Sequence, residues 1–312
     1  MELLDDGNPK IFFGSMEYID GREPEDIYEA TIENLKQGIR HIDCAELYSE
    51  SIPHVAKALI DSGVPRNEIF FCTKIKGLPV GDYRQINARV QNHISALGLE
   101  YVDLLLIHWP GPSDCDFNST IEIFSSKASW EYFDQNIDEA WGNAKRLKQD
   151  GLAQRIGVSN FYQIHLERMP GTPYANQIYI DITHPEYECV EFMLAKGIHV
   201  LAYRSLVFLG AVELAAAMGD TTFSSLTELV EKTHADCVQQ VVIAWLLARG
   251  CSVVLKSSSK PHIISNSKAY DLIEAIDVRS IKEFSKDSNN DIVTMCGGAD
   301  EYANVFRSHN SI

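Results

Sequence analysis

Short apolar runs alternate along this chain with amphipathic segments, and this alternation restricts the fold more than any other feature. The segments between the runs place apolar residues at helical spacing and often end in Gly. No GxGxxG motif opens a helix after the first run, which disfavours a dinucleotide-binding open sheet. Because eight strand-then-helix units suit a closed parallel barrel, the pattern predicts a (β/α)8 barrel. The expected strands are 11–16, 39–43, 68–74, 101–109, 153–160, 174–180, 199–206 and 251–257.

The length and composition suit one large domain. The chain has 312 residues, 45% of them hydrophobic and 23% charged, which is enough to bury a sizeable core. We therefore expect a single domain over 1–312. A Ser-, Asp- and aromatic-rich insertion at 110–136 follows the fourth strand, and a tail at 280–312 follows the last helix. A loop that directly follows a barrel strand lies over the active site, so this insertion is a candidate for substrate selection.

Charge and cysteine usage exclude several classes of partner. The formal net charge of −17 argues against nucleic acids and anionic membranes, which bind clustered Lys and Arg. The first residues are acidic and lack the apolar region of a signal peptide, and no apolar run approaches the ~18 residues of a membrane span. The seven cysteines are widely spaced, without CxxC pairs or zinc-type spacing. These features predict a cytoplasmic protein with reduced thiols and a small-molecule partner.

Protonatable side chains follow three successive strands in the expected barrel. Asp43 and Tyr48 come after the second strand, Lys74 ends the third, and His108 ends the fourth. Each has an ordinary structural explanation when taken alone, such as a helix cap for the Asp or a solvent-reaching Lys. Their occurrence on one rim of the barrel is harder to explain in that way. We interpret them as a catalytic group.

Such a group suits proton donation to a carbonyl oxygen that is coupled to hydride arrival at the carbon. A phenol has a pKa of about 10 in water. We expect the Lys74 ammonium to lower the pKa of Tyr48, while Asp43 keeps that ammonium charged and oriented. A neutral His108 imidazole would donate a hydrogen bond to the substrate oxygen. This chemistry requires no metal.

Several motifs resemble those of the aldo-keto reductase superfamily. The first of them is specific, whereas short motifs such as GVSNF are weak alone. The similarity runs from about residue 10 to about residue 275. The motifs are GIRHIDCAELYSES, LLLIHWPGP, RIGVSNF, NQI, LAYRSL and VVLKSSS.

The resemblance implies a barrel reductase with site residues at matching positions. It implies that Asp43, Tyr48, Lys74 and His108 form a catalytic tetrad. Ser159, Asn160 and Gln177 would hold the nicotinamide carboxamide of the cofactor, and Tyr203 would stack on its ring. The further cofactor residues would be Arg204, Ser205, Leu206, Lys256, Ser257, Ser258, His262 and Asn266. Lys256 and Ser257 match the positions that receive the adenosine 2′-phosphate. The substrate would contact Met16, Tyr48, His108 and Trp109.

The sequence departs from the family pattern at four places. Met16 stands where relatives tend to have Trp, which widens the pocket. Residues 178–183 replace a Glu-x-His-Pro run, and His262 replaces an Arg that stacks on adenine. Arg204-Ser205-Leu206-Val207 replaces Ser-Pro-Leu-Gly. The loss of Pro and Gly alters the loop over the cofactor pyrophosphate, to which Arg204 would bring a direct charge.

We interpret the chain as an NADPH-dependent reductase of aldehydes or ketones. One alternative is an NAD(H)-linked alcohol dehydrogenase on the same fold, and another is a non-catalytic nucleotide-sensing subunit. Lys256 favours NADPH, whereas His262 removes one of its usual supports. The wider pocket at Met16, together with Trp130, Tyr132 and Phe133 of the insertion, suggests a bulky carbonyl substrate. Alternatively, the insertion fills the space left by the missing Trp.

Overall fold

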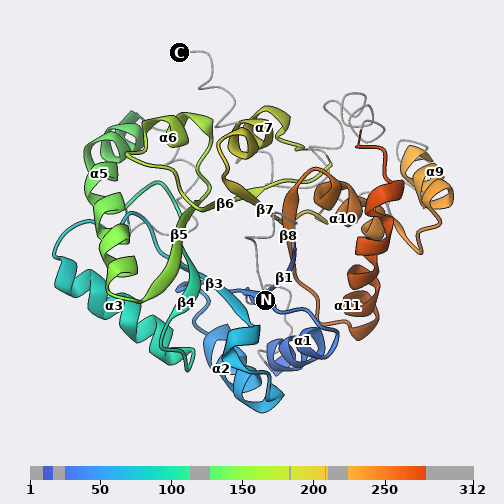
Figure 1. Ribbon diagram of the computed structural model, residues 1–312, viewed down its shortest axis with the longest axis horizontal. Helices are drawn as coiled ribbons and strands as arrows, with labels where there is room; N and C mark the ends of the chain where they lie inside the picture. The colour runs from blue at the N-terminus through green and yellow to red at the C-terminus, as the bar shows by residue number, and fades with distance from the viewer. Residues whose placement is uncertain are drawn as a thin grey trace.

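The computed structural model describes residues 10–16, 25–112, 127–182, 184–207, 209 and 224–278. Within them, parallel strands follow one another around a closed barrel in sequence order, from β1 to β8. The barrel closes because β1 pairs with β2 on one side and with β8 on the other. The expected (β/α)8 architecture is confirmed, with the helices in an outer ring around the strands (Figure 1).

Each apolar run of the sequence contains one strand. Most strands are buried along their whole length, since the barrel interior covers one face and the helices cover the other. This double burial explains why the runs are continuously apolar. The strands are β1 (Ile11–Gly14), β2 (His41–Asp43), β3 (Phe70–Ile75), β4 (Val102–Ile107), β5 (Ala153–Ser159), β6 (Ala175–Tyr179), β7 (His199–Tyr203) and β8 (Cys251–Leu255).

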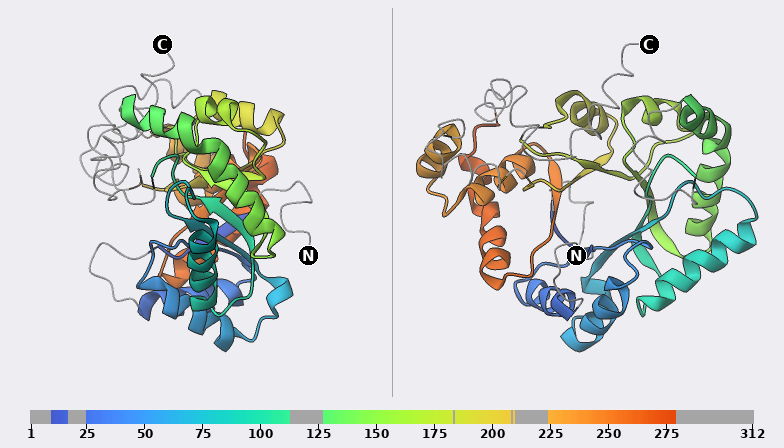
Figure 2. Two further views of the ribbon diagram at one scale, coloured as in Figure 1. Left: turned by 90° about the vertical axis from the view of Figure 1, so that its left-hand side faces the viewer. Right: turned by 180° about the vertical axis from the view of Figure 1, so that it is seen from behind.

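Helices connect the strands and surround the barrel, as the side view and the view from behind in Figure 2 show. The α-helices are α1 (Glu25–Lys36), α2 (Ser51–Ser62), α3 (Tyr83–Ala96), α5 (Lys127–Gln149), α6 (Gln163–Arg168), α7 (Tyr187–Ala195), α9 (Ser224–Thr233), α10 (Val238–Ala248) and α11 (Lys260–Ser267). The described residues also form the 3-10 helices η1 (Arg66–Glu68) and η3 (Lys268–Ala275). Among the described helices, none is both long enough and apolar enough to span a membrane.

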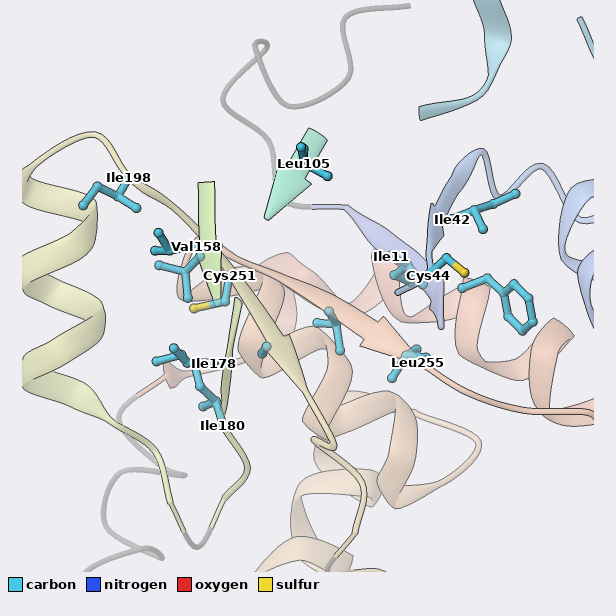
Figure 3. Close-up of a cluster of buried hydrophobic side chains, with 14 of the residues drawn as sticks. Ile11, Ile42, Cys44, Leu105, Val158, Ile178, Ile180, Ile198, Cys251 and Leu255 are labelled. Atoms are coloured by element: carbon cyan, nitrogen blue, oxygen red, sulfur yellow. The ribbon is translucent and has the colours of Figure 1, made fainter. Parts of the chain in front are cut away.

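The core has two parts, one inside the barrel and one between the strands and the helices. Leu104 and Leu106 of β4 belong to the inner cluster, whereas Leu105 and Ile107 belong to the outer one. This alternation follows from the two-residue period of a strand. Figure 3 shows part of the outer cluster, where Ile42, Leu105 and Val158 come from three different strands. The inner cluster consists of Phe12, Phe70, Cys72, Leu104, Leu106, Ala175 and Leu201.

The expected insertion at 110–136 is partly helical. Helix α5 begins at Lys127, so the last ten residues of that range, 127–136, form the first part of this helix. The expectation of a loop throughout 110–136 is therefore wrong for 127–136. Residues 113–126 and the tail at 280–312 lie outside the described residues, so the tail and the one-domain extent stay predictions.

The aromatic residues of this segment pack α5 against α6. The Trp130 ring stacks on that of His165, with ring centroids 4.4 Å apart. Phe133 is buried, and its ring contacts those of Phe161 and His165. The prediction that Phe133 offers surface to a substrate is therefore wrong, because its side chain is occupied in the helix layer. Tyr132 is half-buried and also packs against the core.

Strands β4 and β6 both pack closely against Gly157 of β5. A Cβ atom at this position would lie 2.4 Å from the backbone oxygen of Ala175 and 2.7 Å from a methyl group of Leu106. Both distances are far below van der Waals contact, and the Ala175 oxygen belongs to a neighbouring strand that cannot easily shift. Only glycine fits here without moving β6.

We expect Gly157→Ala to lower the free energy of unfolding by about 1–3 kcal/mol, as overpacking of a well-packed core does. Gly142→Ala in α5 is the matched control, because nothing lies within 4 Å of the added Cβ there. That control should raise the free energy of unfolding by roughly 0.5–1 kcal/mol, since Ala stabilises a helix interior more than Gly does. Urea unfolding of both variants measures the difference, and equal stabilities would contradict the close approach at Gly157.

Candidate active site

The four residues of the expected tetrad lie at the carboxyl ends of neighbouring strands. Asp43 is the last residue of β2, Lys74 lies one residue before the end of β3, and His108 directly follows β4. Tyr48 lies between β2 and α2. In a parallel barrel these strand ends meet at one rim, where the active sites of such barrels lie.

Lys74 and Asp43 form a buried ion pair. Lys74 Nζ donates hydrogen bonds to Asp43 Oδ2 over 2.6 Å and to the Cys44 backbone oxygen over 2.9 Å. Gln177 Nε2 donates to the other Asp43 oxygen over 2.8 Å. The two charged side chains are 1% and 3% exposed. Burial lowers the pKa of Lys74, but attraction to Asp43 and other nearby groups outweighs burial and raises it above its usual value. Lys74 therefore stays charged.

Tyr48 lies beside this ion pair. Lys74 Nζ lies 5.4 Å from the centre of the Tyr48 ring. Burial raises the pKa of Tyr48 to about 12, although the Lys74 charge acts to lower it. The expectation of a lowered pKa is therefore wrong, because desolvation of the phenolate outweighs the attraction to Lys74. The phenol keeps its proton at neutral pH.

His108 faces Tyr48 across the rim. The two rings lie 6.4 Å apart at an interplanar angle of 83°, and the His108 ring stacks on that of Trp109 at 5.6 Å. Burial and the nearby Lys74 charge lower the pKa of His108 well below its usual value, so the imidazole is neutral. Its Nδ1 atom is buried and has no hydrogen-bond partner among the described residues. Trp109 is itself 7% exposed.

The expected nicotinamide residues lie on the next strands and contact one another. Ser159 Oγ donates to the Gln177 backbone oxygen over 2.8 Å. Asn160 Nδ2 donates to the His108 backbone oxygen over 3.0 Å, and Tyr203 OH donates to Asn160 Oδ1 over 2.7 Å. A hydrogen-bonded series therefore runs from β4 through β5 to β7. The sequence predicted these residues one by one but not the bonds between them.

The remaining expected cofactor residues follow β7 and β8. Arg204 is exposed and has a φ of 57°, in the left-handed region, while Ser205 is 1% exposed. Tyr203 pairs with Val254, so Arg204, one residue after Tyr203, and Lys256, two residues after Val254, both follow this last pair of β7 and β8. Lys256 is exposed. Of the other expected cofactor residues, Asn266 is buried and His262 is exposed. The half-buried ones are Leu206, Ser257 and Ser258.

A buried polar cluster that the sequence did not predict lies in the segment after Gln177, where the sequence departs from the family pattern. Tyr179 OH donates to Asp181 Oδ2 over 2.6 Å, and the His184 backbone nitrogen donates to Asp181 Oδ1 over 2.8 Å. All three side chains are buried. The Tyr179 ring also lies 6.1 Å from that of Tyr203, so the cluster supports the expected nicotinamide-stacking residue. The sequence signal that could have revealed this cluster is the polar Asp181, which interrupts an apolar run.

Met16, at the position where the sequence resemblance implies a Trp in relatives, lies two residues after the end of β1. It is half-buried and follows Ser15, whose hydroxyl donates to the Asp43 backbone oxygen over 2.9 Å. The first strand end is thereby tied to the ion pair. Across the described part of the chain, no group of three or more His, Cys, Asp and Glu side chains is placed to hold a metal ion.

Comparisons with known proteins show which family the chain belongs to. The sequence model of the Aldo/keto reductase family matches residues 10–286. An aldehyde reductase of Saccharomyces cerevisiae is 31% identical over 297 residues, covering 89% of this chain and 88% of the relative. A glycerol 2-dehydrogenase (NADP(+)) of the same yeast is 32% identical over 295 residues, with the same coverage.

A solved structure shows the same fold. The Bombyx mori aldo-keto reductase in complex with NADP superposes with a TM-score of 0.72 at 24% identity, covering 88% of each chain. The family match spans most of the barrel, including all four residues of the expected tetrad. The chain is therefore an oxidoreductase that belongs to the aldo/keto reductase family.

Proposed function

We propose that the protein reduces an aldehyde or ketone to an alcohol, with hydride from NADPH and a proton from Tyr48. The observation that carries this proposal is the buried Lys74–Asp43 ion pair beside a protonated phenol. The similarity to an aldehyde reductase and to a glycerol 2-dehydrogenase (NADP(+)) supports the same type of reaction. We further infer a cytoplasmic location, which suits the free thiols of the described cysteines.

Tyr48 acts as the general acid. The carbonyl carbon gains a hydride, the C=O double bond becomes a single bond, and its oxygen takes the phenolic proton. The resulting phenolate is stabilised by the Lys74 ammonium, which Asp43 keeps charged. Because the ion pair is buried, this attraction is screened less than it would be in water. Lys74 therefore favours the transition state, in which negative charge develops on the Tyr48 oxygen, over the ground state.

His108 orients the substrate oxygen. A neutral imidazole carries one N–H, so it can donate a hydrogen bond without competing with Tyr48 for the proton. The buried ring is fixed by its stacking on Trp109 and by the Tyr48 ring opposite. A fixed donor of this kind lowers the barrier mainly through orientation.

The residues at the ends of β5 to β8 fit a dinucleotide. Ser205 Oγ is buried and has no hydrogen-bond partner among the described residues, as expected of a group that meets a ligand. Ser159, Asn160 and Gln177 would hold the carboxamide, Tyr203 would lie against the ring, and Lys256 would receive the 2′-phosphate. The remaining residues of the sequence-based set would line the pyrophosphate and adenosine. NADPH supplies the hydride when bound.

Two alternatives make different predictions. With His262 in place of the usual Arg, one support for NADPH is lost, which favours NADH and an alcohol dehydrogenase activity on the same fold. A non-catalytic nucleotide-sensing subunit would bind the cofactor without turnover, but the complete tetrad argues against it. Oxidation of NADPH and of NADH, each measured with a panel of simple aldehydes, distinguishes the proposed function from both alternatives.

We expect Tyr48→Phe to reduce turnover by on the order of 10² or more, the contribution of general-acid catalysis, while cofactor binding stays nearly unchanged. The rate of NADPH oxidation with an aldehyde measures turnover, and quenching of protein fluorescence measures cofactor binding. Tyr28→Phe is the control, because Tyr28 OH bonds Asp61 between α1 and α2, outside the site. Undiminished turnover in Tyr48→Phe would exclude Tyr48 as the acid.

We expect Lys256→Ala to weaken NADPH binding by roughly 10- to 100-fold, the scale of a charge-assisted hydrogen bond, and to leave NADH binding almost unchanged. Dissociation constants for both cofactors decide this, with Lys57→Ala in α2 as a control for the loss of an exposed charge. Equal weakening of both cofactors would show that Lys256 does not contact the 2′-phosphate.

The substrate is a bulky carbonyl compound, because Met16 leaves more space than Trp and adapts its shape. The comparison of kcat/KM for a small aldehyde and a multi-ring ketone tests this. We expect the ketone to have the higher kcat/KM, by a factor that corresponds to a few kcal/mol. The reason is that it buries more apolar surface, which contributes about 25 cal/mol per Å². Met16→Trp should remove most of that preference. A preference for the small aldehyde that Met16→Trp leaves unchanged would contradict the wide pocket.

A further inference from the structure

The loop that carries Tyr48 is fastened to β3 by Glu46, which lies two residues before Tyr48. The Glu46 backbone nitrogen donates to the Lys74 backbone oxygen over 2.9 Å. The Glu46 side chain then reaches past Lys74, where its Oε2 accepts a hydrogen bond from the Lys76 backbone nitrogen over 2.9 Å. Glu46 thus binds β3 at Lys74 and binds the chain again at Lys76, directly after the end of the strand.

Helix α3 holds this arrangement from the outside. Arg89 Nε lies 3.2 Å from Glu46 Oε1, and both side chains are partly buried at 34% and 21% exposure. One turn further along α3, His93 shares a 2.7 Å hydrogen bond with the Thr73 hydroxyl, directly before Lys74. Burial lowers the pKa of His93 to about 4, so the ring is neutral at neutral pH and does not repel Lys74. Polar contacts therefore hold β3 on both sides of Lys74.

We propose that Glu46 is a positioning residue for Tyr48, which sets the distance between the phenol and Lys74. The hydrogen bonds of Glu46 go to the backbone of Lys74 and Lys76, and not to Lys74 Nζ or the Tyr48 side chain. Glu46 therefore acts through the backbone. Tyr48 follows after one intervening residue, and its own backbone nitrogen donates to Ala45 over 3.0 Å, which makes this turn tight. A shift of the fastened loop is therefore passed directly to the phenol. The proposal rests on the proposed role of Tyr48 as acid.

A second carboxylate provides a matched control at the opposite end of the same strand. Asp103 Oδ2 accepts a hydrogen bond from the Phe71 backbone nitrogen over 2.9 Å and another from Arg66 Nη2 over 2.7 Å. Like Glu46, Asp103 joins a backbone N–H at one end of β3 to an arginine. It lies near the start of β3 and β4, away from the rim that carries the tetrad.

The test compares Glu46→Ala, Glu46→Gln and Asp103→Ala in the full-length protein. A misplacement of about 1 Å can cost on the order of 10²-fold in rate, so we expect kcat of Glu46→Ala to fall by about 10- to 100-fold. Its dissociation constant for NADPH, from fluorescence quenching, should change by less than about twofold, because the cofactor residues lie on β5 to β8. Glu46→Gln keeps an acceptor for the Lys76 N–H and should recover most of the rate.

Asp103→Ala should lower the midpoint of thermal unfolding at least as much as Glu46→Ala, with kcat close to the wild-type value. Equal kcat in Glu46→Ala and Asp103→Ala, with similar losses of stability, would overturn the positioning role and leave Glu46 a structural residue. A wild-type protein that binds NADPH but reduces no carbonyl compound would instead overturn the proposed function, and the role of Glu46 with it.

Discussion

The buried Lys74–Asp43 ion pair is the interaction on which the rest of the site depends. Two charges with almost no exposure need further hydrogen bonds, and these come from Cys44 next in the chain and from Gln177 in β6. Strands β2 and β6 are four strands apart in either direction around the closed barrel. The Gln177 bond therefore crosses the barrel mouth, and it joins the side of the rim that carries Tyr48 to the side proposed to hold the cofactor.

Burial at this rim has opposite consequences for neighbouring groups. It keeps the phenol of Tyr48 protonated and the imidazole of His108 neutral, since each charged form would lose its water. Lys74 stays charged in the same surroundings because Asp43 lies in contact with it. Three groups that would titrate separately in water are thereby fixed in one combination: a proton donor, a neutral hydrogen-bond donor and a fixed positive charge.

The sequence predicted the barrel because each strand is a continuous apolar run, and it predicted the rim residues because polar side chains end those runs. It could not predict the direction of the Tyr48 pKa, which depends on how deeply the folded chain buries the phenol. The bond from Gln177 to Asp43 joins positions 134 residues apart, which no local pattern reveals. The start of α5 was missed because Trp130 and Phe133 suggested a ligand-facing loop, although their spacing of three residues also suits one face of a helix.

Most departures from the family pattern lie in the segments that follow the strands, although the one at 178–183 begins inside β6. Each βα segment of a barrel can change without repacking the strands. Tyr179 and Asp181 form a buried hydrogen bond beside Tyr203, in a segment where the sequence has lost the family's usual run. Arg204 adopts a left-handed backbone conformation that costs a non-glycine residue roughly 1–2 kcal/mol. A strained backbone at an exposed arginine, in a protein with a net charge of −17, supports the proposed contact between Arg204 and the anionic cofactor.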